Sequence, residues 1–280
     1  MWEGKEAVLD ALGALAKAEP GAFAGPGQPP LAPGVTRAAL ITAALGAAAR
    51  RKAAYRSAGL RCLASCLAAC REDCYAQVSP PLLEAVQKHL EAPATEPTAS
   101  GTTPTDNNPT DAKDDEDKPP PPLPLVESLN CLSTAFSHFR AVGGGAPATA
   151  EGAGSCQPLD AEAEAVGQRL AEVVGAVAGA QLPWQQRLAG VRAAAAVAAR
   201  GVALRAAGAA AAPGASTMDV DGPAAAPPAA AGLDAPARWA AAMMAGVAAC
   251  AADIAVQQVR TAALEALEAL AGCVAGGGGT

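Results

Sequence analysis

Apolar residues recur at helical spacing through most of the chain. In the first block Val8, Leu9, Leu12 and Leu15 stand close enough in register to share one helix face, which is typical of an amphipathic α-helix. Pro20 and Gly21 then end the pattern, as helix-breaking residues do. The same spacing predicts helices over about residues 2–19, 36–51, 55–69, 82–90, 125–139, 160–179, 184–204, 238–252 and 254–270.

Composition favours an all-α protein. Residues that prefer strands are sparse, whereas the strong helix formers Ala, Leu, Glu, Arg and Gln dominate the 280 residues. Hydrophobic residues make up 51% of the chain, but aromatic residues make up only 3%. Because burial energy scales with apolar area, a core built mostly of alanine is weaker than the hydrophobic fraction suggests.

Biased segments divide the helical blocks. Segments of Thr, Pro, Asn, Asp, Gly and Ala bury too little apolar surface to offset chain entropy, so we expect them to be disordered. The expected division is 1–90 helices, 91–122 an acidic and Pro-rich insert, 123–205 helices with a Gly/Ala linker near 143–157, 206–236 an Ala/Pro-rich insert, 237–274 a terminal helix pair and 275–280 a disordered tail.

The helical blocks resemble one another and resemble a known repeat. The run Val259-Arg260-Thr261-Ala262-Ala263-Leu264 is similar to the second helix of a HEAT repeat. Small residues let neighbouring helices approach, and such repeats stack because none can bury its apolar face alone. The expected fold is therefore a HEAT/armadillo-like α-solenoid with long disordered inserts in its inter-helix loops, where added length costs little.

Charge and hydropathy exclude several function classes. The formal net charge is −7, which argues against a protein that binds nucleic acid through phosphate contacts. The best uncharged apolar run, 240–252, is too short to span a bilayer, so we expect no membrane insertion. The N-terminus resembles neither a signal nor a transit peptide. We therefore expect a protein of the cytoplasm and nucleus, with its eight cysteines reduced.

A run of cysteines at every fourth position, Cys62, Cys66, Cys70 and Cys74, is the sharpest local pattern. On one helix these thiols form a stripe whose ends lie about 18 Å apart, too far to close a tetrahedral metal site. A buried structural role is therefore favoured over redox sensing or metal binding, since cysteine is often buried. The other four cysteines, Cys131, Cys156, Cys250 and Cys273, are scattered.

No pattern predicts an active site. His89 and His138 lack a neighbouring nucleophile, no phosphate-binding glycine motif follows a strand, and acidic residues at 162, 164 and 172 fit a solvated helix face. We therefore expect no enzyme activity, and no catalytic, cofactor-binding or metal residues, cofactor or small-molecule substrate.

Three further features have a structural and a binding interpretation. The acidic run 111–117 is a solvating insert or a docking segment, and the polyproline run 119–122 is a spacer or a ligand for an aromatic groove. Trp2, Trp184 and Trp239 each open a helix and are interpreted as packing anchors, with a partner hot spot as the alternative.

Five motifs follow the order in which they stand in one protein family. They are Trp2-Glu3-Gly4-Lys5-Glu6, Tyr55-Arg56 before Gly59-Leu60, Pro80-Pro81-Leu82-Leu83, Leu182-Pro183-Trp184 and Val259-Arg260-Thr261. Together they resemble the C-terminal part of the large proteasome-associated HEAT-repeat adaptor. Family members are several times longer, so the resemblance implies that this chain is a C-terminal piece.

The resemblance implies a non-catalytic adaptor or scaffold that binds the proteasome core and regulatory particles, in proteasome assembly or stability. Two alternatives stay open. The first is an unrelated HEAT/armadillo scaffold, such as a transport receptor or an assembly factor. The second is a thiol redox protein that uses the Cys62–Cys74 stripe.

Overall fold

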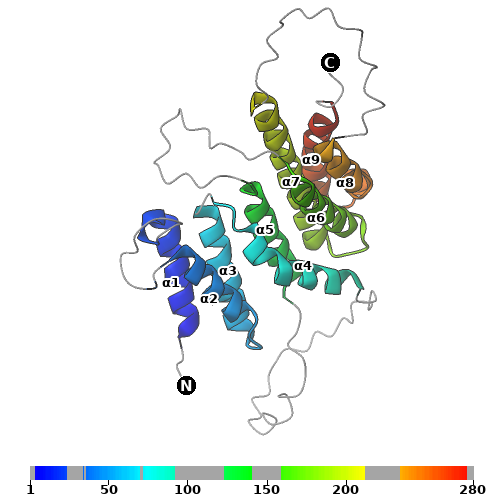
Figure 1. Ribbon diagram of the computed structural model, residues 1–280. Coiled ribbons are helices and arrows are strands. Elements are labelled where there is room, and N and C mark those ends of the chain that lie inside the picture. The colour runs from blue at the N-terminus through cyan, green and yellow to red at the C-terminus, as the bar shows by residue number, and fades with distance from the viewer. Residues whose placement is uncertain are drawn as a thin grey trace, which may run out of the picture.

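A computed structural model gives the structure of the chain and describes residues 4–23, 34, 36–69, 72–91, 123–140, 159–211 and 234–275. These residues form nine α-helices and a short 3-10 helix, as Figure 1 shows. The elements are α1 (Lys5–Ala18), η1 (Pro20–Ala22), α2 (Arg37–Ala48), α3 (Ala53–Ala69), α4 (Tyr75–Glu91), α5 (Leu125–Ser137), α6 (Ala161–Gly179), α7 (Trp184–Ala211), α8 (Ala235–Ala252) and α9 (Gln257–Ala275).

The helices pack in two rows. In the first row α1, α3, α5, α7 and α9 follow one another, and each contacts the next; in the second row α4, α6 and α8 do the same (Figure 1). Each of α2, α4, α6 and α8 also packs against the odd-numbered helix that follows it. The predicted all-α class is confirmed, and the stacking of helix pairs is consistent with an α-solenoid.

Small residues set the spacing between several helices. Where α6 crosses α8, a Cβ atom added to Gly246 would stand 2.2 Å from the carbonyl oxygen of Gly175. Where α2 meets α3, a Cβ atom on Gly59 would stand 2.6 Å from the carbonyl oxygen of Ala44. These backbones are too close for any larger residue. The small Ala and Gly residues at these crossings therefore allow the helix backbones to come into close contact.

An aromatic cluster joins the first five helices to the last four. It consists of Tyr75 on α4, Phe136 and Phe139 at the end of α5, and Trp239 on α8. The Phe136 ring stacks on Phe139 at 5.0 Å and meets Trp239 edge-on at 5.7 Å. The indole ring of Trp239 covers Gly167 on α6, where a Cβ atom would lie 2.0 Å from the ring.

The tryptophans differ in their surroundings. Trp239 is 1% exposed, and its indole N–H donates to the carbonyl oxygen of Glu164 at 3.2 Å, so the predicted packing role is right at this position. Trp184 is 40% exposed at the start of α7, so the same prediction is wrong there. Trp2 lies outside the described residues.

Two helix starts differ from the predicted ones because carboxylates cap them earlier. The predicted helix 82–90 begins at Tyr75, where Asp73 accepts a hydrogen bond from the Tyr75 backbone N–H at 3.0 Å. Pro80 and Pro81 therefore lie inside α4, on its exposed side. The helix predicted from residue 238 begins at Ala235, because Asp234 accepts from the Ala237 N–H at 3.0 Å.

Two helices extend past their predicted ends, although α9 also begins at Gln257 rather than at residue 254. α7 continues to Ala211, into the range expected to be insert, and α9 extends to Ala275. Residue 91, expected to begin an insert, is instead the last residue of α4. Residues 92–122, 143–157 and 212–233 of the expected inserts lie outside the described residues.

Polar contacts tie together the described residues that flank each long undescribed segment. His89 Nε2 lies 2.8 Å from the carbonyl oxygen of Leu123, on either side of residues 92–122. The Arg140 guanidinium contacts both carboxylate oxygens of Asp160 at 2.9 Å. In the same way Arg205 contacts both oxygens of Asp234 at 2.6 Å. Each of these three contacts therefore joins the described residues before an undescribed segment to those after it.

Candidate binding surface

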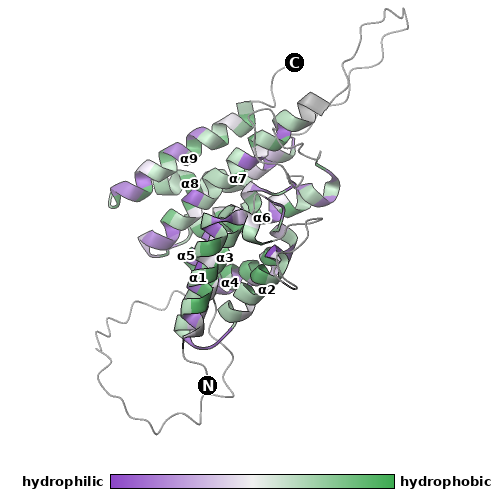
Figure 2. Ribbon diagram, turned by 90° about the vertical axis from the view of Figure 1, so that its left-hand side faces the viewer, coloured by the Kyte–Doolittle hydropathy of each residue, from purple (hydrophilic) through white to green (hydrophobic). Residues whose placement is uncertain are grey.

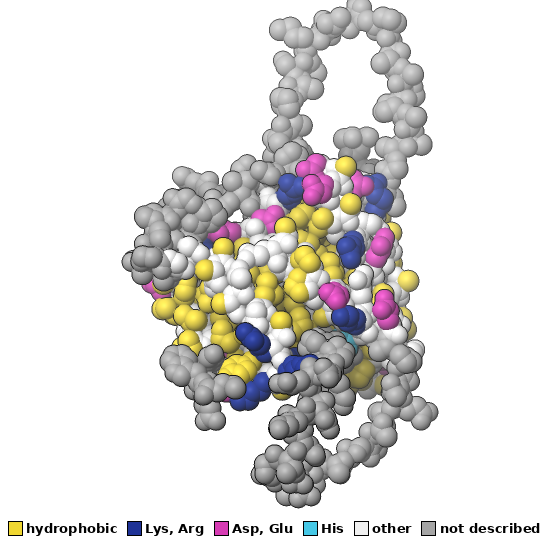
Figure 3. Space-filling model, turned by 60° about the horizontal axis from the view of Figure 1, so that its bottom comes forward, with side chains coloured by type: hydrophobic (Ala, Val, Ile, Leu, Met, Phe, Trp, Pro, Cys, Tyr) yellow, Lys and Arg dark blue, Asp and Glu magenta, His cyan; other side chains and the backbone are white. Residues whose placement is uncertain are grey.

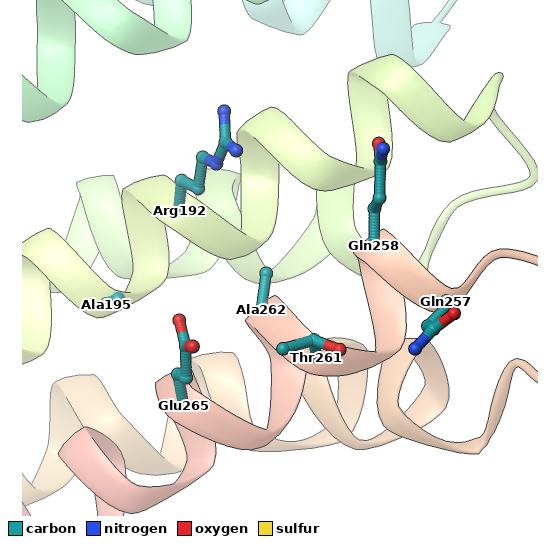
Figure 4. A pocket seen from close by; sticks show the side chains of 7 residues that line it. All are labelled: Arg192, Ala195, Gln257, Gln258, Thr261, Ala262 and Glu265. Carbon is teal, nitrogen blue, oxygen red and sulfur yellow. The ribbon is translucent and has the colours of Figure 1, made fainter.

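A groove between α7 and α9 is the candidate functional site. It has a volume of about 570 Å³ and opens to solvent. Arg192 and Ala195 of α7 form one side, and the first turns of α9 form the other (Figure 4). The residues from α9 are Gln257, Gln258, Thr261, Ala262 and Glu265.

The pattern of α9 explains this groove. Its buried residues recur at helical spacing and face the core; they are Val259, Ala263, Ala266, Leu270 and Cys273. Gln257, Thr261 and Glu265 therefore fall on the opposite, exposed side at intervals of four residues. Ala195 and Ala262 are small, so they leave space between the two helices, and in Figure 4 the Arg192 side chain extends away from α9.

The groove is lined by polar and charged side chains from both helices. A glutamine side chain both donates and accepts hydrogen bonds, and so does the Thr261 hydroxyl. Arg192 and Glu265 place charges of opposite sign on the two helices. Such a lining suits the backbone amides of an extended peptide. Among the described residues that line the groove there is neither a histidine nor a cysteine.

The surface around the stack carries mixed charge. On the face shown in Figure 3, basic and acidic side chains are interspersed, and hydrophobic side chains lie between them. Several charges are paired across helices, including Arg187 with Asp253 and Arg238 with Glu164. Glu164, one of the acidic residues singled out in the sequence, thus belongs to an ion pair between α6 and α8.

The structure places the cysteine stripe inside the core. Cys62 and Cys66 lie on α3 and are each 1% exposed. Because α3 ends at Ala69, Cys74 is not on the same helix, and the single stripe predicted over residues 62–74 does not form. Cys70 lies outside the described residues. A hydrogen bond with Cys66 lowers the pKa of the Cys62 thiol, although burial opposes that shift.

Three other thiols cap backbone carbonyls between helices. The Cys131 sulfur lies 3.7 Å from the Leu60 oxygen, Cys250 lies 3.1 Å from the Ala178 oxygen, and Cys273 lies 3.2 Å from the Ala198 oxygen. Burial raises the pKa of Cys131 to about 12 and raises the pKa values of Cys250 and Cys273 as well. These cysteines therefore stay protonated and serve packing. Cys156 lies outside the described residues.

The histidines have structural surroundings. His89 contacts the Leu123 carbonyl, and His138 ends α5, where its backbone N–H donates to the Ala135 oxygen at 3.3 Å. The acidic run 111–117 and the polyproline run 119–122 lie outside the described residues.

Within the described ranges, no three His, Cys, Asp or Glu side chains are grouped so that they could hold a metal ion. None of the helices in that part of the chain combines the length and apolar character needed to cross a bilayer.

Sequence reasoning missed the groove. The signal that could have found it is the exposed series Gln257, Thr261 and Glu265, which alternates with the buried series of α9. Comparisons of the chain with protein-family models, with curated proteins and with solved structures found no match.

Proposed function

We propose that the protein is a non-catalytic scaffold that binds a protein partner through its stacked helices. The observation that carries this proposal is the polar groove between α7 and α9, two neighbours in the same row. A stack of this kind presents an extended surface without needing a deep active site.

The finer proposal is a HEAT/armadillo-like piece of a proteasome adaptor, acting in proteasome assembly or stability in the cytoplasm and nucleus. The pairing of each even-numbered helix with the next odd-numbered one supports the repeat type. The ordered motifs, from Tyr55-Arg56 to Val259-Arg260, support the family. The partners would be the core and regulatory particles.

The test is co-sedimentation of the purified full chain with purified proteasomes, as core particles and as core with regulatory particles. We expect the chain to bind at least one of the two forms. If it binds neither form, the proteasome proposal is overturned. The double variant Gln257→Ala/Gln258→Ala removes two amide groups from the groove and should weaken binding at least tenfold. Gln185→Ala, an exposed glutamine of α7 outside the groove, is the matched control and should bind like the wild type.

Another HEAT/armadillo scaffold role remains the second candidate, because helix stacking is common to transport receptors and assembly factors. This role would be favoured if the chain did not bind proteasomes but bound another purified protein, and if the Gln257→Ala/Gln258→Ala variant bound that protein more weakly.

The redox alternative requires a thiol that reacts quickly in the folded chain. Because Cys62 and Cys66 are each 1% exposed, we expect both to be alkylated slowly. Mass spectrometry of the alkylated protein checks this, and a fast, stoichiometric reaction at either residue would revive the alternative.

A further inference from the structure

A basic turn joins α2 to α3. It consists of Arg50, Arg51 and Lys52, which are the only three consecutive basic residues in the sequence, and all three are exposed. The Lys52 ammonium nitrogen lies over the ring of Tyr55, 5.3 Å from its centroid. In Figure 2 the turn is purple, the colour of hydrophilic residues, and lies at the lower end of the two helices. The turn therefore presents a concentrated positive charge to its surroundings.

Two contacts show that α3 and α5 run in the same direction. Near the middle of the two helices, the Cys131 sulfur lies 3.7 Å from the Leu60 oxygen. Just beyond their C-terminal ends, the Arg140 N–H donates to the Asp73 carboxylate at 2.7 Å. The two helices therefore also begin at the same end of the stack.

This register brings Leu123 close to the basic turn. Lys52 and Leu123 stand eight positions before Leu60 and Cys131, respectively, which is about 12 Å along either helix. The axes of packed helices are about 8–10 Å apart. Residues 92–122, which lie outside the described residues, are therefore followed by a residue that lies beside α3 at the level of the basic turn.

The densest negative charge in the sequence stands shortly before Leu123. Residues 114–117, part of the acidic run, are the only four consecutive acidic residues; they are Asp114, Asp115, Glu116 and Asp117. An extended chain spans about 3.3–3.6 Å per residue, so the stretch from these residues to Leu123 can cover about 20–30 Å. That length is sufficient for residues 114–117 to contact the basic turn.

We propose that the basic turn binds residues 114–117 of the same chain. The fold brings the strongest positive and the strongest negative runs of the sequence to one end of the stack, and their charges are complementary. Because the contact is intramolecular, the effective concentration of the acidic residues is on the order of millimolar, so a weak ionic attraction is enough to form it. Any separate anionic molecule must compete with residues 114–117 for the basic turn.

Cross-linking of the purified full chain with a carbodiimide tests the contact, because this reagent joins an ammonium group to a carboxylate that touches it. Mass spectrometry identifies the joined residues, and we expect amide bonds from Lys52 to residues 114–117. Lys88 is the matched control: it is exposed and precedes residue 92 by four positions, but it already pairs with Glu84 at 2.7 Å. Its cross-links to residues 114–117 should be at least fivefold fewer.

A charge variant tests whether the basic turn holds the acidic residues. Arg50→Ser/Arg51→Ser keeps the reactive Lys52 but removes two charges, so the Lys52 cross-links should fall at least fivefold. Arg169→Ser/Arg260→Ser is the matched control, because it removes two exposed charges from α6 and α9, and it should change nothing. Circular dichroism checks the helix content of both variants.

Competition tests the same contact without a cross-linker. In Asp114→Asn/Asp115→Asn/Glu116→Gln/Asp117→Asn the basic turn loses its occupant. A fluorescent synthetic peptide with the sequence of residues 111–118 should bind this variant at least threefold more tightly than the wild type, as measured by fluorescence anisotropy. Equal affinities would show that residues 114–117 do not occupy the turn in the wild type.

Other cross-linking results would also overturn the proposal. They are no cross-link from Lys52 to residues 114–117, cross-links that are as frequent from Lys88, and cross-links that persist in Arg50→Ser/Arg51→Ser. A mixture of isotope-labelled and unlabelled chains shows whether the joined residues come from two copies, which would contradict an intramolecular contact. None of these outcomes depends on proteasome binding, so this proposal and the proposed function can fail separately.

Discussion

Two kinds of helix contact hold this protein together, and they differ in how closely the backbones approach. At the aromatic junction, rings from α4, α5 and α8 fill the space between helices, with Phe136 in contact with three other rings. At the crossing of α6 and α8, no side chain lies between Gly175 and Gly246. Removing atoms should therefore damage the first contact, and adding atoms should damage the second.

The comparison also shows how a chain with few aromatic residues forms a continuous stack. The sequence has three Trp, two Tyr and three Phe, and four of these rings gather where the first five helices meet the last four. Ala, Gly and Leu suffice within each helix pair, because small residues allow close approach and many weak contacts. The large aliphatic side chains are buried all along the stack, whereas the aromatic rings gather where its two parts join.

Trp239→Ala should have the largest effect. It leaves a cavity against Phe136 and Gly167 and removes the hydrogen bond to Glu164, so we expect a loss of about 3–5 kcal/mol in the free energy of unfolding. Urea unfolding followed by circular dichroism measures it. Trp184→Ala is the control, because Trp184 is 40% exposed, and its cost should stay below about 1 kcal/mol. Equal costs would show that Trp239 is not the centre of the junction.

Gly246→Ala should have the next largest effect. The added methyl group would stand 2.2 Å from the Gly175 oxygen, so α6 and α8 must separate, at a cost of about 1–3 kcal/mol. Gly272→Ala is the control, because it adds the same methyl group to α9 where nothing lies within 4 Å. It should be neutral or stabilising, since alanine is the better helix former. If Gly246→Ala were also stabilising, the close crossing of α6 and α8 would be wrong.

Asp253→Asn should have a smaller effect that depends on pH. The hydrogen bond from Arg187 holds the pKa of Asp253 below its ordinary value of 3.8. A depressed folded-state pKa stabilises the protein above pH 3.8, and the stabilisation is lost as the pH falls through the folded value. The variant should therefore be less stable than the wild type at neutral pH, and the difference should shrink below pH 3.8. Thermal unfolding at several pH values checks this, and a difference that does not change with pH would contradict it.

Shortening the segment 141–158 should have the smallest effect. Its flanking residues Arg140 and Asp160 are already held together, and loop-closure entropy changes by only about 0.6 kcal/mol for each doubling of loop length. Replacement by a short Gly/Ser linker should therefore change the free energy of unfolding by less than about 1 kcal/mol. A loss of several kcal/mol would show that the segment takes part in the fold. Arg140→Ala in the same shortened chain tests whether the ion pair between Arg140 and Asp160 contributes to the free energy of unfolding.

The sequence predicted helices best where local signals agree. The start of α6 is right because Asp160 caps it, and the Ala163 N–H donates to its carboxylate at 2.7 Å. The start of α4 is wrong because Pro80-Pro81 is a typical helix-start signal, whereas the cap that operates is Asp73. Asp73 also accepts from the Arg140 N–H at 2.7 Å, a contact across 67 positions that no local pattern reveals.

Long-range contacts also explain what the sequence did not predict in the core and at the candidate site. Arg200 is buried because its guanidinium donates to the Phe139 carbonyl at 2.7 Å, a partner from another helix. Trp184 and Trp239 were both predicted to stand at a helix start, yet among the described rings only Trp239 meets other rings. The groove depends on Arg192 standing across from the polar side of α9, and that follows from the packing of α7 on α9.

Hydrogen–deuterium exchange of the backbone amides, read by mass spectrometry, tests the central comparison most directly. It follows every helix of the stack in one experiment. We expect exchange to be slowest in α6 and α8, where Trp239 covers Gly167 and where Gly175 meets Gly246. Exchange should be faster in α1, which packs mainly against α3 and η1. Equal, rapid exchange in α6, α8 and α1 would contradict the claim that close glycine contacts and a single aromatic junction hold the stack together.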